Sequence, residues 1–204
     1  IIGSVDTSII GSTTLIYNIS DSSGNAANQL VRTVNVTEDT LPVISLIGES
    51  SVTIEVFSSY NDDGATAIDN YDGDITSSIV STVDVDPTIL GVYTISYNVS
   101  DSSGNTAIEV TRNVNVVDTT VPLISIIGDS SIYIELGETF NDPGATAVDN
   151  YDGNISGNIS VSGVVDVNSA GTYSIVYNVS DSQGNVATQI IRTVIVGTPP
   201  SISL

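Results

Sequence analysis

The stretch that decides the fold is residues 91–116, which read GVYTISYNVSDSSGNTAIEVTRNVNV. Apolar or aromatic residues occupy every second position from Tyr93 to Val99, so their side chains would lie on one face of a strand. A polar turn at 101–105 follows, and the next strand places apolar residues on one face at Ile108, Val110, Val114 and Val116. Two alternating segments around a Gly-containing turn are typical of a β-hairpin.

This hairpin pattern recurs along the chain with a spacing of 80 residues. The motif Tyr-Asn-(Ile/Val)-Ser-Asp-Ser-(Ser/Gln)-Gly-Asn begins at Tyr17, Tyr97 and Tyr177, and Arg follows at positions 32, 112 and 192. A second motif, Gly-Ala-Thr-Ala-X-Asp-Asn-Tyr-Asp-Gly, occurs at 64–73 and 144–153. Self-similarity at a fixed period is the signature of tandem repeats.

The repeat frame predicts the domain boundaries. Two full repeats are expected at 39–118 and 119–198, whereas residues 1–38 match only the C-terminal half of a repeat and 199–204 match only its start. Half of a two-layer domain cannot bury its own sheet face. We therefore expect this sequence to be part of a longer array.

The rest of each repeat also has the pattern of strands. Short apolar runs at 43–47, 52–56, 65–69 and 79–85 are separated by Gly, Asp and Pro turns, and no segment has a sustained period of 3.6 residues. Val, Ile, Thr and Tyr favour pleated strands. About six or seven short strands per repeat predict an all-β fold of tandem immunoglobulin-like β-sandwich domains in an elongated array.

Composition excludes several classes of function. The chain contains no Cys, His or Lys, which closes thiolate, imidazole and Schiff-base catalysis and zinc sites built on Cys or His. With 24 acidic residues against three Arg, the net charge is −21, which disfavours nucleic acid and anionic membranes as partners. No apolar run approaches the ~20 residues of a membrane helix. We predict no catalytic residues, no enzyme activity and no membrane insertion in this segment.

The acidic residues are concentrated in loops that recur in each repeat. In an immunoglobulin-type sandwich, the loop between the second and third strands lies at the same pole as the last hairpin turn and the N-terminal entry. The candidate metal ligands in the loops are Asp69, Asp72, Asp74 and Asp101 in one repeat, and Asp149, Asp152, Asn154 and Asp181 in the next. The linkers would add Glu38, Asp39 and Asp118.

Such a gathering of acids favours a bound cation. Two carboxylates ~5 Å apart repel by roughly 3 kcal/mol at an effective dielectric constant of about 20. Ca²⁺ prefers several carboxylate and carbonyl oxygens, so we hypothesise a Ca²⁺ site at each domain junction. The alternative is that these are ordinary Asp/Asn/Gly turns, whose side chains hydrogen-bond their own backbone.

Other recurring residues point to structural roles. Arg32, Arg112 and Arg192 fall in register with the apolar face of the last strand, and we predict structural ion pairs with Asp6, Asp86 and Asp166, which also recur every 80 residues, with a Tyr ring alongside. Tyr93 and Tyr173 each stand two residues after a Gly and resemble the tyrosine corner, whose hydroxyl binds an upstream backbone group.

The order of these motifs resembles the Ig-like repeats of bacterial surface proteins, which are related to hyalin-type and cadherin-like repeats. The shared elements are Pro-X-Ile-X-Leu-X-Gly, Asn-Asp-Pro-Gly-Ala-Thr-Ala, Asp-Asn-X-Asp-Gly, Gly-X-Tyr and Tyr-X-Val-Ser-Asp-X-X-Gly-Asn. Residues 119–198 carry the pattern best, whereas the preceding repeat has Asp63 where the family has Pro, and Thr13 stands where later repeats have Tyr.

The resemblance implies a non-catalytic role outside the cell or at its surface. It implies a spacer or stalk whose partners are the neighbouring repeats of the same chain. Two alternatives stay open: a self-assembling extracellular filament or surface-layer subunit, and an adhesin module that binds glycan or protein.

Overall fold

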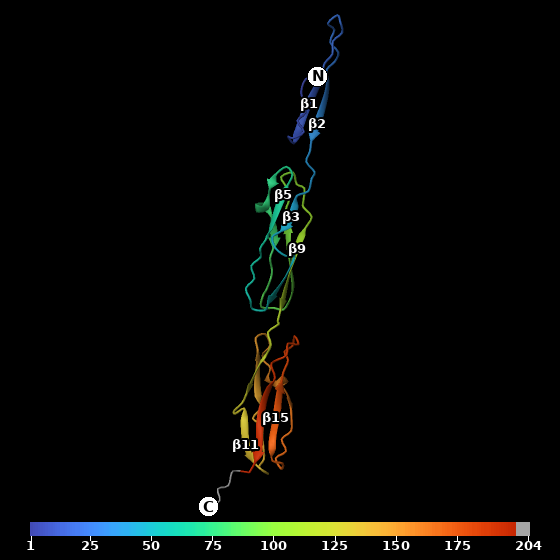
Figure 1. Ribbon diagram of the computed structural model, residues 1–204. Helices are drawn as coiled ribbons and strands as arrows, with labels where there is room; N and C mark the ends of the chain where they lie inside the picture. The colour runs from blue at the N-terminus through green and yellow to red at the C-terminus, as the bar shows by residue number, and fades with distance from the viewer. Residues whose placement is uncertain (199–204) are drawn as a thin grey trace, which may run out of the picture. The chain divides into compact units, whose positions relative to one another are not determined.

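A computed structural model describes residues 1–198 of the chain (Figure 1). The predicted start of a further repeat at 199–204 lies outside the described residues. Contacts divide the chain into two compact units, the first formed mainly by residues before 116 and the second mainly by residues from 116 onward. The described residues contain no helix with the length and apolar character needed to cross a membrane.

The first strands form a two-stranded antiparallel sheet. Strands β1 (Gly11–Tyr17) and β2 (Leu30–Val36) pair from Gly11 opposite Val36 to Tyr17 opposite Leu30. Leu30 and Val31 are both more than half exposed. Both side chains of this adjacent pair are therefore largely uncovered within the described residues.

The next strands form two sheets. One has the order β3-β5-β6, and the other has the order β4-β9-β8-β7, with a short 3₁₀ turn η1 (Thr76–Ser78) before β7. The strand bounds are β3 (Val43–Leu46), β4 (Ser51–Glu55), β5 (Ala65–Asp69), β6 (Gly73–Asp74), β7 (Val80–Thr82), β8 (Gly91–Asn98) and β9 (Val110–Val117).

The same arrangement recurs in the following residues. The sheets have the orders β10-β12-β13 and β11-β16-β15-β14, and β11 runs parallel to β16. The bounds are β10 (Leu123–Ile126), β11 (Ser131–Glu135), β12 (Ala145–Asp149), β13 (Gly153–Asn154), η2 (Ser156–Asn158), β14 (Ser160–Ser162), β15 (Gly171–Asn178) and β16 (Ile190–Gly197). The predicted all-β, immunoglobulin-like fold is confirmed.

The core takes every second residue of the strands, as alternation predicts. In the second unit, buried side chains come from both sheets and form one cluster, which includes Ile124, Ala147, Ile175, Tyr177, Val194 and Val196. The same positions 80 residues earlier are also buried. One predicted core residue is wrong: Ile108 is 79% exposed, because β9 begins only at Val110 and residues 106–109 are not in a strand.

A buried arginine lies in the core of each full repeat. Arg112 forms an ion pair with Asp62, donates to the carbonyls of Ile47 and Glu49, and lies over the ring of Tyr97. The Tyr97 hydroxyl donates to the other Asp62 oxygen at 2.6 Å. Because every charged or polar group has a partner, the guanidinium is tolerated at 1% exposure.

The second unit repeats the ion pair, the ring contact and the tyrosine hydrogen bond with Arg192, Asp142 and Tyr177, but the buried Arg192 Nε has no hydrogen-bond partner among the described residues. The prediction of buried arginines beside tyrosine rings is therefore confirmed, but the predicted acidic partners Asp86 and Asp166 are wrong. Asp166 instead accepts the backbone N–H of Asn168 at 3.0 Å. In the first sheet, Arg32 is exposed over the ring of Tyr17, and Asp6 accepts hydrogen bonds from Ser8.

The tyrosine corner is confirmed at Tyr173. Its hydroxyl donates to the backbone oxygen of Ser169 at 2.9 Å, four residues upstream. This bond fixes the entry into β15, so the residue has a structural role.

Candidate functional site

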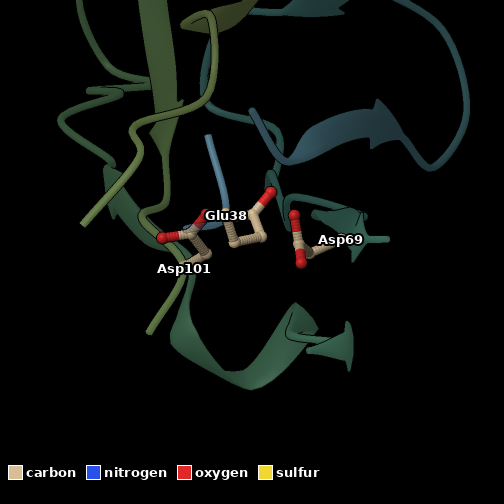
Figure 2. A group of neighbouring side chains, drawn as sticks. All are labelled: Glu38, Asp69 and Asp101. Atoms are coloured by element: carbon tan, nitrogen blue, oxygen red, sulfur yellow. The ribbon is translucent and has the colours of Figure 1, made fainter. Parts of the chain in front are cut away.

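The first unit contains a cluster of three carboxylates, Glu38, Asp69 and Asp101. One oxygen from each lies within 4.8 Å of the others. Figure 2 shows the Glu38 side chain between those of Asp69 and Asp101. Three segments far apart in the sequence deliver them: the segment after β2, the last residue of β5, and the turn after β8.

Two of these residues are fixed by their own turns. The Asp69 Oδ1 atom accepts the backbone N–H groups of Tyr71 and Asp72 at 2.8 and 2.9 Å. The Asp101 Oδ1 atom accepts the N–H of Asn105 at 2.7 Å, across a turn in which Gly104 has a φ of 92°. A positive φ favours glycine at this position. The predicted Asx-type turns are therefore present, and they orient the carboxylates.

Asn105 holds the third carboxylate in place. Its Nδ2 group donates to Glu38 Oε2 at 2.6 Å and to Asp101 Oδ2 at 2.7 Å, so it bridges two members of the cluster. It also donates to the backbone oxygen of Glu38 at 3.3 Å. This residue was not among the predicted site residues, although it closes the recurring Asp-Ser-Ser-Gly-Asn motif.

The second unit contains the equivalent cluster, Asp118, Asp149 and Asp181. All three are buried, with exposures of 5%, 4% and 8%. Asp149 Oδ1 accepts the N–H groups of Tyr151 and Asp152, and Asp181 accepts from Asn185 as Asp101 does from Asn105. Asn185 Nδ2 differs from Asn105 Nδ2 in its contact with the linker residue. It donates to the backbone oxygen of Asp118, at 3.1 Å, and not to the Asp118 carboxylate.

Three oxygens in the clusters are buried without a protein partner. Among residues 1–198, the Oδ2 atoms of Asp69, Asp118 and Asp149 have no hydrogen bond. A buried carboxylate oxygen without a donor is costly. Each cluster thus presents negative charge to a position that no protein donor fills.

The titration of these groups reflects how well each is satisfied. Burial raises the pKa of Asp118 above its ordinary value, and the charges of Asp149 and Asp181 raise it further, against a hydrogen bond from Thr120. Burial acts in the same direction on Asp181, but hydrogen bonds from Asn185 outweigh it and lower the pKa of that carboxyl. Burial is likewise outweighed at Asp101, where Asn105 lowers the pKa.

Several predicted ligands lie outside the clusters. Asp72 accepts the N–H and hydroxyl of Ser102 at 2.7 and 2.8 Å, and Asp152 does the same with Ser182, so both tie the acidic loop to the hairpin turn. Asp74 and Asn154 accept the N–H groups of Thr76 and Ser156 at the start of the 3₁₀ turns. Their side chains are used locally.

Asp39 is exposed and does not belong to the first cluster either. The sequence predicts both Glu38 and Asp39 as metal ligands, because both are acidic residues of the linker. Adjacent side chains in an extended segment point to opposite sides, so only one of the two can face the loops. The structure brings Glu38 to the cluster.

The turn in the first sheet has the same local hydrogen bonds as the later turns. Asp21 accepts from Ser23 and Asn25, as the later aspartates do in their turns, and these hydrogen bonds lower its pKa. It is exposed and belongs to neither three-carboxylate cluster.

Comparisons with known proteins agree with this architecture. Residues 44–116 and 124–196 match the family described as bacterial surface protein, Ig-like domain. The chain belongs to this family. Its two full repeats are surface Ig-like domains, as the motifs implied.

Proteins with similar sequences come from different organisms and are much longer than this chain. The chain is 29% identical over 200 residues to hyalin of Strongylocentrotus purpuratus, covering 93% of this chain and 16% of hyalin. It is 33% identical over 140 residues to the pesticidal crystal protein Cry22Aa of Bacillus thuringiensis, covering 65% of this chain and 19% of that protein. The chain thus spans less than a fifth of the length of these relatives.

Among solved structures, the chain is similar to the lipoprotein BT2262 of Bacteroides thetaiotaomicron. The sequence identity is 32%, the TM-score is 0.35, and the match covers 39% of this chain and 40% of the lipoprotein. A second similar structure contains the carbohydrate-binding module CBM51-2 and INT domains of Clostridium perfringens ZmpB, with 28% identity, a TM-score of 0.33, and coverage of 38% of this chain and 17% of that one.

Proposed function

We propose that this chain is a non-catalytic, extracellular spacer segment of a surface protein, and that each full repeat binds one Ca²⁺ through its three-carboxylate cluster. The observation that carries the proposal is the set of buried carboxylate oxygens without a donor at both clusters. Membership of the surface Ig-like family supports the extracellular spacer role.

The electrostatics of the clusters favour a cation. The carboxylate oxygens in each cluster lie within 4.8 Å of one another. At that separation each pair of charges repels by about 3 kcal/mol at an effective dielectric constant near 20. The whole stability of a small domain is only about 5–15 kcal/mol. A divalent cation would convert these repulsions into attractions.

The donor set favours calcium among the divalent cations. The chain has no Cys or His, so every side-chain ligand available here is oxygen. Ca²⁺ accepts six to eight oxygens in flexible geometry, whereas Mg²⁺ requires a near-ideal octahedron. Three carboxylates would supply the charged ligands, and carbonyl groups and water would supply the rest.

Calcium binding would also stiffen the chain. Glu38 and Asp118 belong to the segments that join consecutive repeats in the sequence. A cation that binds one linker carboxylate and two loop carboxylates would hold the linker against the repeat that follows it. Fixing a linker residue removes backbone freedom that otherwise costs about 1–2 kcal/mol per residue.

Calorimetric titration of the whole chain with Ca²⁺ tests the binding. We expect about two equivalents, with one lost in Asp69→Asn, one lost in Asp149→Asn, and both lost in the double variant. Asp74→Asn is the matched control, because Asn154 already occupies that position in the next repeat and both lie outside the clusters. If the wild-type chain gives neither heat nor a thermal shift, it binds no calcium and the proposal is wrong.

Small-angle scattering tests the spacer role separately. We expect the chain to sample a narrower range of end-to-end distances with Ca²⁺ than with a chelator, and the double variant to be insensitive to either. Binding without any change in scattering would retain the calcium site and refute the stiffening.

One observation favours self-assembly as a second candidate function. Strands β3 and β10 lie at the edges of their sheets, and each carries a largely exposed apolar side chain, Val43 at 65% and Leu123 at 71%. An apolar groove with Ile108 or Thr188 in its wall lies beside each of them. Exposed apolar edge strands favour pairing between chains. Sedimentation at increasing concentration, with Val43→Ser/Leu123→Ser as the variant, tests it.

A further inference from the structure

Glu55, the last residue of β4, binds the linker that follows β9. Its carboxylate accepts the backbone N–H of Thr119 at 2.9 and 3.1 Å and the Thr119 hydroxyl at 2.7 Å. It also accepts the N–H and the hydroxyl of Thr120 at 3.2 and 2.8 Å. Both carboxylate oxygens are therefore occupied, and two consecutive linker residues are held through four donors.

The same linker segment carries a member of the second cluster. Asp118 immediately precedes Thr119, and its Oδ1 atom accepts the N–H of Thr120 at 3.2 Å. The Thr120 N–H is thus shared between Glu55 and Asp118. The position of the Asp118 backbone, and with it the direction of its side chain, depends on the segment that Glu55 holds.

We propose that Glu55 is a positioning residue for the cation site formed by Asp118, Asp149 and Asp181. It fixes the linker so that Asp118 already lies among the other two carboxylates before the cation binds. This inference rests on the proposed calcium binding. Preorganisation of this kind increases affinity because binding no longer has to order the ligand.

Glu55 acts through the linker and not as a ligand itself. It does not belong to the three-carboxylate cluster, and both of its oxygens accept hydrogen bonds from Thr119 or Thr120. Hydrogen bonds from the Thr119 backbone and hydroxyl, and then from Thr120, lower the pKa of Glu55 to about 2, against the effect of burial.

The linker of the first cluster has the same local cap as that of the second, but the hydrogen bonds of Glu55 go to Thr119 and Thr120 and not to this linker. There the N–H of Thr40 donates to the Oε1 atom of Glu38 itself, at 2.6 Å. Glu38, a member of the first cluster, thus also caps its own linker. The affinity of the first cluster should accordingly not respond to substitution of Glu55.

The test uses the whole chain with Asp69→Asn, so that only the second cluster titrates. In that background, Glu55→Ala should weaken Ca²⁺ binding about tenfold, the usual size of a lost outer-shell hydrogen bond at a metal site. Glu55→Gln keeps one acceptor oxygen and should lose less. Glu135→Ala, the same substitution at the end of β11, is the matched control and should bind as the parent does.

Amide hydrogen exchange in the chelated chain provides a readout independent of affinity. Thr119 and Thr120 should exchange faster in Glu55→Ala than in Glu135→Ala. If the two variants bind Ca²⁺ equally, the positioning role is overturned while the calcium site stands. If Glu55→Gln abolishes binding as completely as Asp118→Asn, Glu55 is a ligand and the inference is wrong. If the parent chain binds no Ca²⁺, the proposed function fails together with the inference.

Discussion

The two carboxylate clusters come from equivalent positions of the repeat but differ in how many of their carboxylate oxygens accept hydrogen bonds. In the first cluster, Asn105 donates to the side chains of both Glu38 and Asp101, and only Asp69 keeps an unpartnered buried oxygen. In the second, Asn185 binds the side chain of Asp181 alone, and both Asp118 and Asp149 keep one.

The difference follows from the length of one side chain. Glu38 has one more methylene group than Asp118, so its carboxylate reaches the Asn105 amide, whereas Asn185 meets only the backbone oxygen of Asp118. An amide N–H and a cation compete for the same lone pairs. The second cluster should therefore bind a cation more tightly, because less of its charge is already neutralised by hydrogen bonds.

The largest expected effect is the loss of stability when a buried arginine loses its carboxylate partner. It shows whether the two repeats also differ outside the clusters. Asp62→Ala and Asp142→Ala each leave a buried guanidinium without its carboxylate and should cost about 3 kcal/mol of unfolding free energy. Because the two ion pairs match, the two losses should be similar, although Tyr60 donates to Asp62 only in the first repeat and Arg192 Nε lacks the acceptor that Arg112 Nε has. Denaturant unfolding in the presence of a chelator measures both.

A large inequality between these two variants would break the comparison. It would mean that the cores of the repeats differ in stability, and that differences in cation affinity could not be assigned to the clusters alone. Tyr60→Phe is the control, because the following repeat already has Phe140 at that position. It should account for the part of any difference that comes from the Tyr60 hydrogen bond.

The second prediction concerns the linker carboxylates directly. Asp118→Asn should weaken Ca²⁺ binding at the second cluster by more than about tenfold, because it removes a buried charged ligand with an oxygen that no donor satisfies. Glu38→Gln should weaken the first cluster by a smaller factor, since Asn105 and Thr40 already bind that carboxylate. Calorimetry with Asp69→Asn or Asp149→Asn as the background isolates each cluster. Equal losses would refute the ranking.

The fold and the three carboxylates of each cluster could be predicted from the sequence because they depend on regular patterns. Alternation fixed the strands, and the topology of the sandwich brought Asp69, Asp101 and the linker acid to one pole. The pattern could not separate Asp69 from Asp72 and Asp74, since all three are acidic residues of one short loop. Which carboxylate faces inward depends on the turn, where Asp69 accepts two of the following N–H groups.

The arginine partners show a second limit of periodicity. Asp62 and Asp142 recur with the same spacing as Asp86 and Asp166, so the period alone cannot distinguish them. The deciding feature is three-dimensional. Arg112 of β9 also donates a hydrogen bond to the backbone oxygen of Gly64, so the loop that carries Asp62 lies next to this arginine.

A third prediction reverses the usual effect of removing a charge. In a chelator, Asp149→Asn should stabilise the second unit by about 1 kcal/mol, because it removes two repulsive pairs. The Asn oxygen can still accept from Tyr151 and Asp152, and its new amide meets the unsatisfied oxygen of Asp118. Asp69→Asn should stabilise less, since the facing Glu38 oxygen is already bound. With Ca²⁺ present both variants should become less stable than the wild type, and thermal unfolding in both conditions tests the change of sign.

The smallest effect is a pH dependence that separates the core carboxylates from the cluster carboxylates. Burial raises the pKa of Asp62, but the Tyr97 hydroxyl and Arg112 outweigh it and lower the pKa below its ordinary value. The unfolded chain then binds the proton more tightly, so this stabilisation is present at neutral pH and is lost as the pH falls below about 4. Asp118 has a raised pKa, so without a cation its protonation stabilises the folded state as the pH falls. In a chelator between pH 6 and 3, Asp62→Asn should therefore lose less stability than the wild type, and Asp118→Asn should lose more. Parallel curves for the two variants would show that the clusters and the core networks titrate alike, and would remove the electrostatic difference on which the cation site depends.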